Sequence, residues 1–409
     1  MSTPSPTPAT EPDDLVRQKV EQLPAVLREK GIDVWMIFAR ETELLHDPSL
    51  DTVVGANVTW QSAFLFGAGG ERIAIVGSLD VARIERTGLF PRVIGYVKSI
   101  RDDLRRELGA LDPQVLALNY STDSELADGL THGMYLLLGE LLESTPYLGH
   151  AVSSHAVLAA LRGRKSAGEL GRIRQACALT QQIFDAVTPR LAAGLTERDV
   201  AALIRGEMGA RGLGPAWEPE QCPAVFTGPG SAGAHAGPTD TRIEPGHVLN
   251  VDFGVRFRGY CSDMQRTWYF LRPDEKAAPE AVARGFATIR DAIREAAAAL
   301  RPGRLGHEID AVARGLITAG GYPEYDHALG HQVGRTAHDG AALLGPRWER
   351  YARRVEEPIE AGQVFTLEPR LPIQGHGIAT MEEIVAVTAT GCEWLTEPQT
   401  ELYLVPHCR

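Results

Sequence analysis

The chain has 409 residues, more than one hydrophobic core usually serves, so we expect two domains. Its 44% hydrophobic and 23% charged residues are typical of a globular protein. A formal net charge of −12 argues against nucleic acid or an anionic membrane as a partner. No apolar run approaches the ~18 residues that cross a bilayer, and the N-terminus lacks signal-peptide features. The five cysteines are scattered, which argues against disulfides and a zinc knuckle and favours the cytoplasm.

The first part of the chain predicts one α/β domain over residues 13–160. Residues 1–12, rich in Pro, Ser and Thr, are expected to be a disordered leader. Residues 13–31 have the pattern of an amphipathic helix. Strand-like and helix-like segments then mix; the strands begin at Asp33, Ser62, Arg72, Arg92 and Gln114, and one helix begins near Met134. No glycine-rich phosphate loop supports nucleotide binding.

The second part, residues 161–409, predicts an α+β domain. The basic, glycine-bearing stretch "LRGRKSAGEL" marks the expected boundary. Helices are expected over residues 169–191, 196–212, 280–300 and 306–319, and strands at "QVFTLEP" and "EEIVAVT". We therefore expect long helices that cover a mainly antiparallel sheet.

Two aspartates lie in "NVDFGVRFRGYCSDMQ" (residues 250–265), a stretch whose other residues favour strands. A turn centred on Phe257 and Arg258 would place Asp252 directly opposite Asp263, on one face of a hairpin. Two like charges about 4.5–5.5 Å apart among aromatic residues repel each other. A divalent cation between them is the simplest remedy, and two cations would suit bridging carboxylates.

Two other interpretations of this stretch exist. The aspartates could belong to an ordinary solvent-facing hairpin, because Asp is common near turns. "DFG" at Asp252 also echoes a magnesium motif of protein kinases. No His-Arg-Asp loop or glycine-rich nucleotide loop precedes it, however, which argues against a kinase.

Further metal-binding side chains follow downstream. The stretch "HALGHQVGRTAHDG" holds His327, His331 and His338, and its glycines favour a strand or turn over a helix. Glu368 ends the strand-like "FTLEP", and Glu382 precedes an apolar strand. Each of these residues is weak evidence alone. Histidines in one loop are often unrelated to one another, and a glutamate at a strand end is usually solvated. Together, two Asp, two Glu and one His predict an oxygen-rich site for two ions such as Mn²⁺, with Co²⁺ or Zn²⁺ also possible.

The second half resembles the pita-bread metallopeptidases: methionine aminopeptidase, aminopeptidase P and prolidase. The matching pieces are "HAGPTDTRIEPGHVLNVDFGVRFRGYCSDMQRTW", "GHQVGRTAHD", "FTLEP" and "MEEIVAVT". The first half resembles the amino-terminal domain of the prolidase, aminopeptidase P and creatinase branch. This resemblance implies five metal ligands, which are Asp252, Asp263, His331, Glu368 and Glu382.

The resemblance also implies roles for residues around the metals. Glu368 would shuttle a proton, and His235 and His338 would steady the substrate and its oxyanion. His327 would shape a proline pocket. Prolidases often have an arginine where this chain has Thr380, so Arg354 and Arg370 are the candidates for binding a substrate carboxylate.

The implied function is hydrolysis of the Xaa-Pro bond in dipeptides or short peptides, by a homodimer whose amino-terminal domains contribute to assembly. Two alternatives remain open: a hydrolase of non-peptide amides or esters on the same metal site, and a binding protein without catalysis. Scaffold proteins without catalysis have usually lost metal ligands, whereas this chain has all five.

Overall fold

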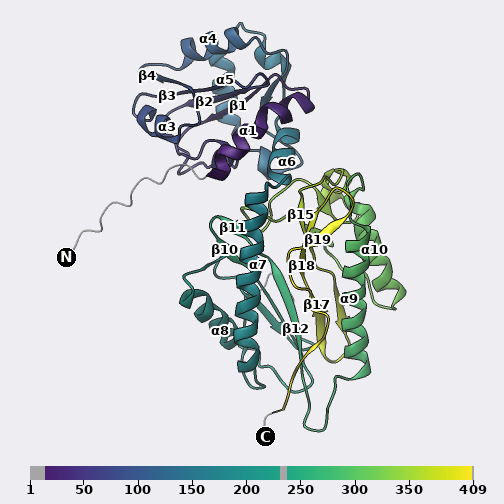
Figure 1. Ribbon diagram of the computed structural model, residues 1–409. Coiled ribbons are helices and arrows are strands. Elements are labelled where there is room, and N and C mark those ends of the chain that lie inside the picture. Colours follow the sequence, from purple (N-terminus) through teal and green to yellow (C-terminus); the bar gives the residue numbers. More distant parts are fainter. Residues whose placement is uncertain (1–13, 231–236, 408–409) are drawn as a thin grey trace, which may run out of the picture. The chain divides into compact units, whose positions relative to one another are not determined.

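The computed structural model describes residues 14–230 and 237–407, and the chain divides into two compact units between Arg162 and Gly163 (Figure 1). The expected leader, residues 1–12, lies outside the described residues. The expected boundary at residues 160/161 lies two residues before this division, within helix α6 (His155–Gly163). The basic, glycine-bearing stretch resembled a linker, but its first residues complete the last turn of this helix.

The first unit is a six-stranded mixed sheet in the order β4-β3-β2-β1-β5-β6, with helices on both faces. Its strands are β1 (Val34–Ala39), β2 (Ser62–Gly67), β3 (Arg72–Gly77), β4 (Arg92–Tyr96), β5 (Leu116–Leu118) and β6 (Ala151–Ser153). Its helices are α1 (Asp14–Glu29), α2 (Leu50–Val53), α3 (Val81–Thr87), α4 (Arg101–Leu111), α5 (His132–Leu141) and α6.

Both faces of this sheet are apolar because its strands alternate between two cores. In β1, Trp35 and Ile37 pack into the core that includes α1, α3 and α6, whereas Met36 and Phe38 pack into the core that includes α4 and α5. A sheet buried on both faces reads as a continuous apolar run, which is what the sequence of β1 contains. The predicted α/β class of this unit is confirmed.

Within its described residues, the second unit combines four long helices with short, mainly antiparallel sheets. Its helices are α7 (Ala167–Val187), α8 (Glu197–Ala210), α9 (Glu280–Ala299) and α10 (Gly306–Ala319). Its strands are β7 (Gly214–Pro215), β8 (Ala224–Thr227), β9 (Val248–Phe253), β10 (Val255–Phe257), β11 (Tyr260–Cys261), β12 (Met264–Phe270), β13 (Gly330–His331), β14 (Leu343–Leu344), β15 (Val364–Leu367), β16 (Arg370–Ile373), β17 (Gly377–Thr380), β18 (Glu383–Val387), β19 (Cys392–Trp394) and β20 (Tyr403–Val405). The predicted α+β class is confirmed.

Helices flank the strands of this unit on two sides (Figure 1). On one side, Phe184 of α7 packs against Phe253 of β9 and Trp268 of β12, with ring centroids 4.7 and 5.8 Å away. On the other side, α9 and α10 share one apolar core with residues of β15 to β18. The predicted helix over residues 169–191 ends earlier than expected, at Val187, because Pro189 follows within a short 3₁₀ turn.

The hairpin that holds the two aspartates has a different register from the predicted one. Asp252 pairs with Gln265, not with Asp263. The tight turn is formed by Arg258 and Gly259, whose φ angles of 47° and 79° suit a two-residue hairpin turn, and Gly259 adopts such an angle at little cost. The prediction was therefore wrong by two residues, and a shift of two keeps both aspartates on the same face.

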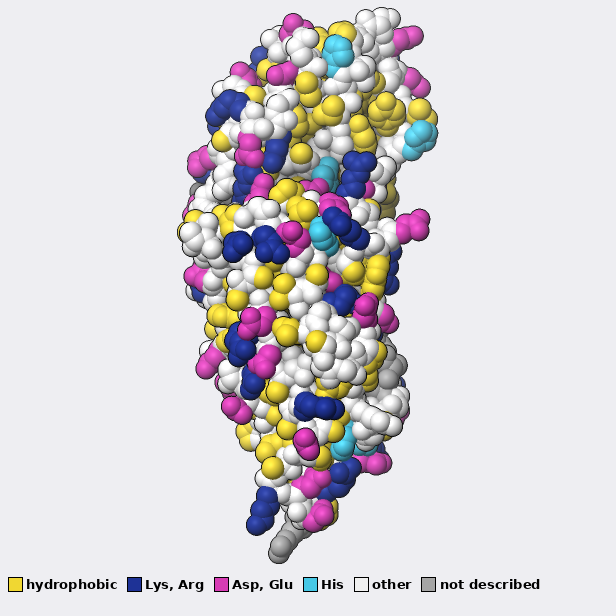
Figure 2. Space-filling model, turned by 90° about the vertical axis from the view of Figure 1, so that its right-hand side faces the viewer, with side chains coloured by type: hydrophobic (Ala, Val, Ile, Leu, Met, Phe, Trp, Pro, Cys, Tyr) yellow, Lys and Arg dark blue, Asp and Glu magenta, His cyan; other side chains and the backbone are white. Residues whose placement is uncertain are grey.

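Among the described residues of the two units, no helix is both long and apolar enough to cross a bilayer. On the face of the molecule in Figure 2, basic and acidic side chains are interspersed.

The corrected register makes a prediction about Gly254, which joins β9 to β10. A Cβ atom at this position would lie 1.8 Å from the backbone oxygen of Ser262. Gly254→Ala should therefore destabilise the protein by about 1–3 kcal/mol, since the hairpin backbone must move apart. The control is Gly171→Ala in α7, where a Cβ meets nothing within 4 Å, and where alanine should be neutral or stabilising. Equal urea midpoints for the two variants would contradict the register.

Candidate metal centre

Two aspartates from the hairpin form one wall of the centre. Asp252 lies near the end of β9, and Asp263 immediately precedes β12. Their carboxyl groups are close enough to share a hydrogen bond, which requires a proton between them. The Oδ1 atom of Asp252 is fully enclosed and has no hydrogen-bond partner. An enclosed carboxylate oxygen without a donor is costly unless a cation meets it.

His331 and Glu368 form the second wall. His331 Nε2 lies 3.1 Å from Glu368 Oε1 and 3.8 Å from Asp263 Oδ2. Thr366 of β15 holds both residues: its Oγ1 accepts a hydrogen bond from the His331 backbone N–H at 3.0 Å and donates one to Glu368 Oε1 at 3.0 Å. Strands β13 and β15 thus fix the two side chains by a common hydroxyl.

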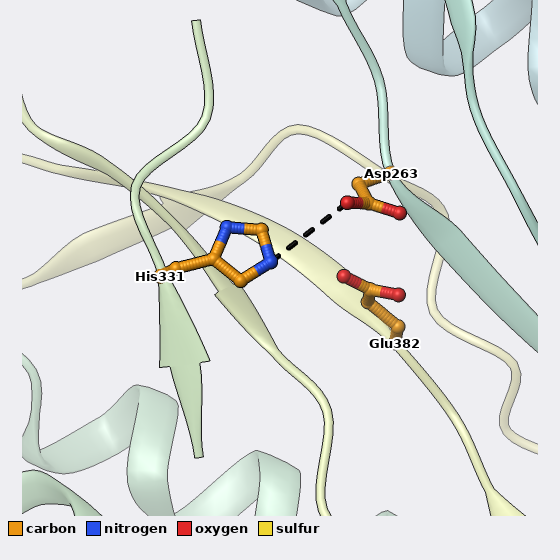
Figure 3. A group of neighbouring side chains, drawn as sticks. All are labelled: Asp263, His331 and Glu382. Atoms are coloured by element: carbon orange, nitrogen blue, oxygen red, sulfur yellow. Dashed lines mark ion pairs between the residues drawn. The ribbon is translucent and has the colours of Figure 1, made fainter. Parts of the chain in front are cut away.

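Glu382 closes the centre from the start of β18, and Figure 3 shows its carboxylate facing Asp263 and His331. One metal-binding atom from each of these three residues lies within 4.8 Å of the other two. Gln265 of β12 donates from Nε2 to Glu382 Oε2 at 3.0 Å, whereas Glu382 Oε1 is enclosed without a partner. The three residues therefore offer one ion a set of oxygen and nitrogen ligands.

The electrostatics of the centre demand positive charge. Burial raises the pKa of Asp252, Asp263 and Glu382 well above the usual carboxyl range, and repulsion from neighbouring carboxylates adds to this rise. Burial also acts against ionisation of Glu368. A hydrogen bond from His331, the charges of His331 and His327, and a hydrogen bond from Thr366 together outweigh it and lower the pKa of Glu368. Four carboxyl groups, two enclosed oxygens without donors and one imidazole fit divalent cations, which prefer such ligands.

Two more histidines lie around this cluster. The ring of His338 meets that of His331 edge to face, with centroids 4.2 Å apart, and His338 is exposed. His327 interacts electrostatically with Glu368, and burial lowers the pKa of His327. Its Nδ1 lies 2.7 Å from the Ala328 carbonyl oxygen, so Nδ1 donates and Nε2 is the acceptor in the neutral ring. His235 lies outside the described residues.

The two arginines expected to bind a substrate carboxylate have partners within the protein. Arg354 donates from Nε to the Ala341 oxygen at 3.1 Å and from Nη2 to the Gly340 oxygen at 3.3 Å. Arg370 pairs through Nη2 with the exposed carboxylate of Asp326. Arg370 thus lies close to His327 and Asp326. Arg354 is bound to the backbone of the segment that follows His338.

Sequence reasoning missed three residues that orient the candidate ligands. They are Gln265, Thr366 and Thr380; the Thr380 hydroxyl donates to Gln265 Oε1 at 2.9 Å, and Gln265 in turn donates to Glu382. Each follows or precedes a candidate ligand by two residues along an extended segment. A period of two was the available signal, since such residues share a face of the sheet.

Residues 171–389, more than half of the chain, match the model of metallopeptidase family M24. An uncharacterized peptidase of Staphylococcus saprophyticus is 28% identical over 337 residues, which cover 82% of this chain and 87% of that protein. The Xaa-Pro dipeptidase of Pyrococcus horikoshii is 30% identical over 247 residues, which cover 60% of this chain and 66% of the dipeptidase.

Solved structures show the same fold over nearly the whole chain. The X-Pro aminopeptidase of Thermotoga maritima superimposes with a TM-score of 0.70 at 24% identity, and covers 94% of this chain and 99% of its own. The Xaa-Pro dipeptidase of Bacillus anthracis superimposes with a TM-score of 0.72 at 22% identity, and covers 95% and 100%.

The charge balance of the centre predicts that Asp263→Asn changes stability in opposite directions without and with metal. In the metal-free protein, raised carboxyl pKa values mean that the folded state binds protons more tightly than the unfolded state. Stability then falls as pH rises above the ordinary carboxyl pKa of about 4. The variant should therefore have the higher melting temperature at pH 8, and a smaller advantage at pH 5.

Added Mn²⁺ should reverse this order. At a free ion concentration of 1,000 times the dissociation constant, bound metal should stabilise the wild type by about 4 kcal/mol. The variant lacks one metal ligand and should gain less. Differential scanning calorimetry of both proteins after chelation, and again with Mn²⁺, measures the effect. A variant that is less stable than the wild type in both conditions would contradict a cation requirement.

Proposed function

The chain belongs to metallopeptidase family M24 and is a metallopeptidase, and from this premise we propose that it is a dinuclear exopeptidase which hydrolyses Xaa-Pro bonds. The observation that supports the proposal best is the convergence of buried carboxyl groups on His331, with enclosed oxygens of Asp252 and Glu382 that lack donors. The Xaa-Pro dipeptidase and X-Pro aminopeptidase among the similar proteins support the substrate class.

Two divalent ions would be held by Asp252, Asp263, His331, Glu368 and Glu382, with Mn²⁺ as the first expectation because carboxylates dominate the set. When bound, such ions acidify a water molecule and polarise a carbonyl group. Gln265 and Thr366 orient Glu382, Glu368 and His331 for this purpose.

Glu368 is the proton carrier in this proposal. Thr366 donates a hydrogen bond to its Oε1 at 3.0 Å, which holds the carboxylate in place to accept a proton from the attacking water. The same group can then deliver the proton to the nitrogen that leaves. His338, exposed beside His331, can donate a hydrogen bond to the carbonyl oxygen as negative charge develops there, and His235 is proposed for the same task.

Proline recognition is assigned to the side of the centre that holds His327. The nitrogen of an Xaa-Pro bond has no N–H, so a peptidase must recognise the ring by shape. The His327 ring packs at 5.0 Å from Tyr325, a buried aromatic residue. Arg370 and Arg354 remain the residues proposed to meet the part of the substrate that follows the proline ring.

Cleavage before proline can be measured directly. With Mn²⁺, the purified protein should hydrolyse Ala-Pro or Ala-Pro-Ala and leave Ala-Ala and Ala-Ala-Ala nearly intact. Asp263→Asn should lose at least about 10³-fold in kcat with an unchanged circular dichroism spectrum, because the ion it holds would act in the transition state. Rapid cleavage of a p-nitrophenyl ester, without any Xaa-Pro hydrolysis, would instead favour a non-peptide hydrolase. Metal binding without turnover on any substrate would favour a binding protein.

We also propose a cytoplasmic homodimer, with the first unit as its assembly domain. The first unit contains no cluster of metal-binding side chains among its described residues. Trp60, Leu79 and Val97 are exposed near one end of its sheet, with exposed fractions of 39%, 76% and 73%. An exposed apolar group of this kind marks association surfaces.

Multi-angle light scattering at micromolar concentration should give the mass of a dimer. Leu79→Asp combined with Val97→Asp should give the monomer mass, since two charges cannot be buried without partners. The matched control is Leu316→Asp, an exposed leucine of α10 in the second unit. A monomeric wild type would refute the dimer.

A further inference from the structure

An open pocket of about 650 Å³ lies on the second unit and is lined by Asp326, Trp348, Glu349 and Arg350. Its wall combines aromatic and cationic groups with the carboxylates of Asp326 and Glu349. The rings of Trp348 and Tyr351 stack with centroids 5.7 Å apart, and the guanidinium of Arg350 lies 4.7 Å from the first ring and 4.9 Å from the second. Such a wall offers a flat apolar surface and a charged donor at the same place.

The rim of this pocket adjoins the segment that holds His327. Asp326, on its rim, directly precedes His327 in the chain and pairs with Arg370. Arg370 lies two residues after Glu368, and His327 interacts electrostatically with both Glu368 and Arg370. A peptide that leaves the metal centre past His327 therefore reaches the rim of the pocket next.

A buried arginine holds the pocket and the His327 segment in one fixed relation. Arg314 of α10 binds Asp310 through two hydrogen bonds of 2.7 and 2.9 Å. It also donates to the backbone oxygens of Tyr325 and His327, at 2.6 and 2.9 Å. The same guanidinium lies 5.2 Å from the centroid of Trp348. The wall of the pocket and the backbone beside the metal centre thus share one rigid support.

The charges at the rim disfavour a dipeptide. The carboxylate of Xaa-Pro follows the proline ring directly, and would meet Asp326, whose own carboxylate is exposed and paired with Arg370. The Nε and Nη2 groups of Arg354 already donate to the backbone oxygens of Ala341 and Gly340, so this edge of its guanidinium does not face a substrate carboxylate. A longer peptide presents a neutral amide at the rim instead, and its next residue extends toward Trp348 and Arg350.

We propose that this pocket binds the residue after proline, so that the enzyme prefers Xaa-Pro-Yaa peptides to Xaa-Pro dipeptides, with Trp348 and Arg350 as specificity residues. The proposal rests on the Xaa-Pro activity proposed above. Trp348 supplies the surface against which the Yaa side chain packs. The Nη2 group of Arg350 donates to the Asp326 backbone oxygen and to the Tyr351 hydroxyl, so the other N–H groups of its guanidinium would supply hydrogen bonds to the carboxylate of a tripeptide.

The test compares kcat/KM for Ala-Pro, Ala-Pro-Ala and Ala-Pro-Phe in the Mn²⁺-loaded protein. The wild type should prefer both tripeptides, and Ala-Pro-Phe most. Trp348→Ala and Arg350→Ala should each lower kcat/KM for Ala-Pro-Phe about tenfold, the effect of losing one charge-assisted hydrogen bond or its equivalent in packing. Both should change kcat/KM for Ala-Pro by less than about twofold, because a dipeptide does not reach the pocket.

The matched control is Arg347→Ala, which removes a neighbouring exposed arginine that pairs with Glu356 and does not line the pocket. It should leave all three values unchanged. Binding of the product can be measured independently of turnover. Isothermal titration should show that the wild type binds Pro-Phe more tightly than proline, and that Trp348→Ala binds the two with equal affinity.

Equal losses on dipeptide and tripeptide, or a wild type that prefers Ala-Pro, would overturn the pocket assignment and leave the Xaa-Pro activity standing. No cleavage of any of the three peptides by the metal-loaded wild type would overturn the proposed function, and this inference with it.

Discussion

Mutual repulsion among buried carboxyl groups is the constraint on which the second unit depends. Asp252, Asp263, Glu368 and Glu382 converge from separate strands, and His331 is the neutral or cationic group among them. Protons can relieve the repulsion only in part, since enclosed oxygens still lack donors. Cations would relieve it more completely, which is why we propose that these groups form a metal centre.

The rest of the unit serves to keep these groups together. Gln265 and Thr366 give each glutamate a defined hydrogen bond, so the carboxylates cannot rotate away from the centre. Gly330 allows β13 to approach β15 closely, because a Cβ there would lie 1.9 Å from the Thr366 backbone oxygen. The helices pack their apolar faces against these strands from both sides. Hydrogen bonds and packing thus hold the candidate ligands in fixed positions.

Much of the fold and of the candidate site could be predicted, because the residues of a strand reflect which of its faces are buried. Continuous apolar runs such as β1 predicted a sheet covered on both faces, and Asp252 and Asp263 stood out among aromatic neighbours. The register of their hairpin was wrong by two residues, since the turn depends on the positive φ angles of Arg258 and Gly259 rather than on the centre of the sequence. The error left the aspartates together because side chains alternate with period two.

The surroundings of the centre were harder to predict because they depend on contacts between distant segments. Nothing local to Arg370 indicates that Asp326 pairs with it, 44 residues earlier in the chain. The contact of Arg314 with Trp348 likewise joins α10 to the short 3₁₀ helix Glu349–Tyr351, which Trp348 precedes. Such pairings decide which part of a substrate can be held, and so they affect specificity more than the metal chemistry.

The most direct measurement of the central claim is metal stoichiometry. Protein that is freed of metal by chelation, dialysed against Mn²⁺ and passed over a desalting column should retain two ions per chain by plasma mass spectrometry, and Asp263→Asn should retain fewer. A wild type that retains no Mn²⁺, Co²⁺ or Zn²⁺, yet folds and keeps its melting temperature, would contradict the view that these carboxyl groups are gathered to hold metal.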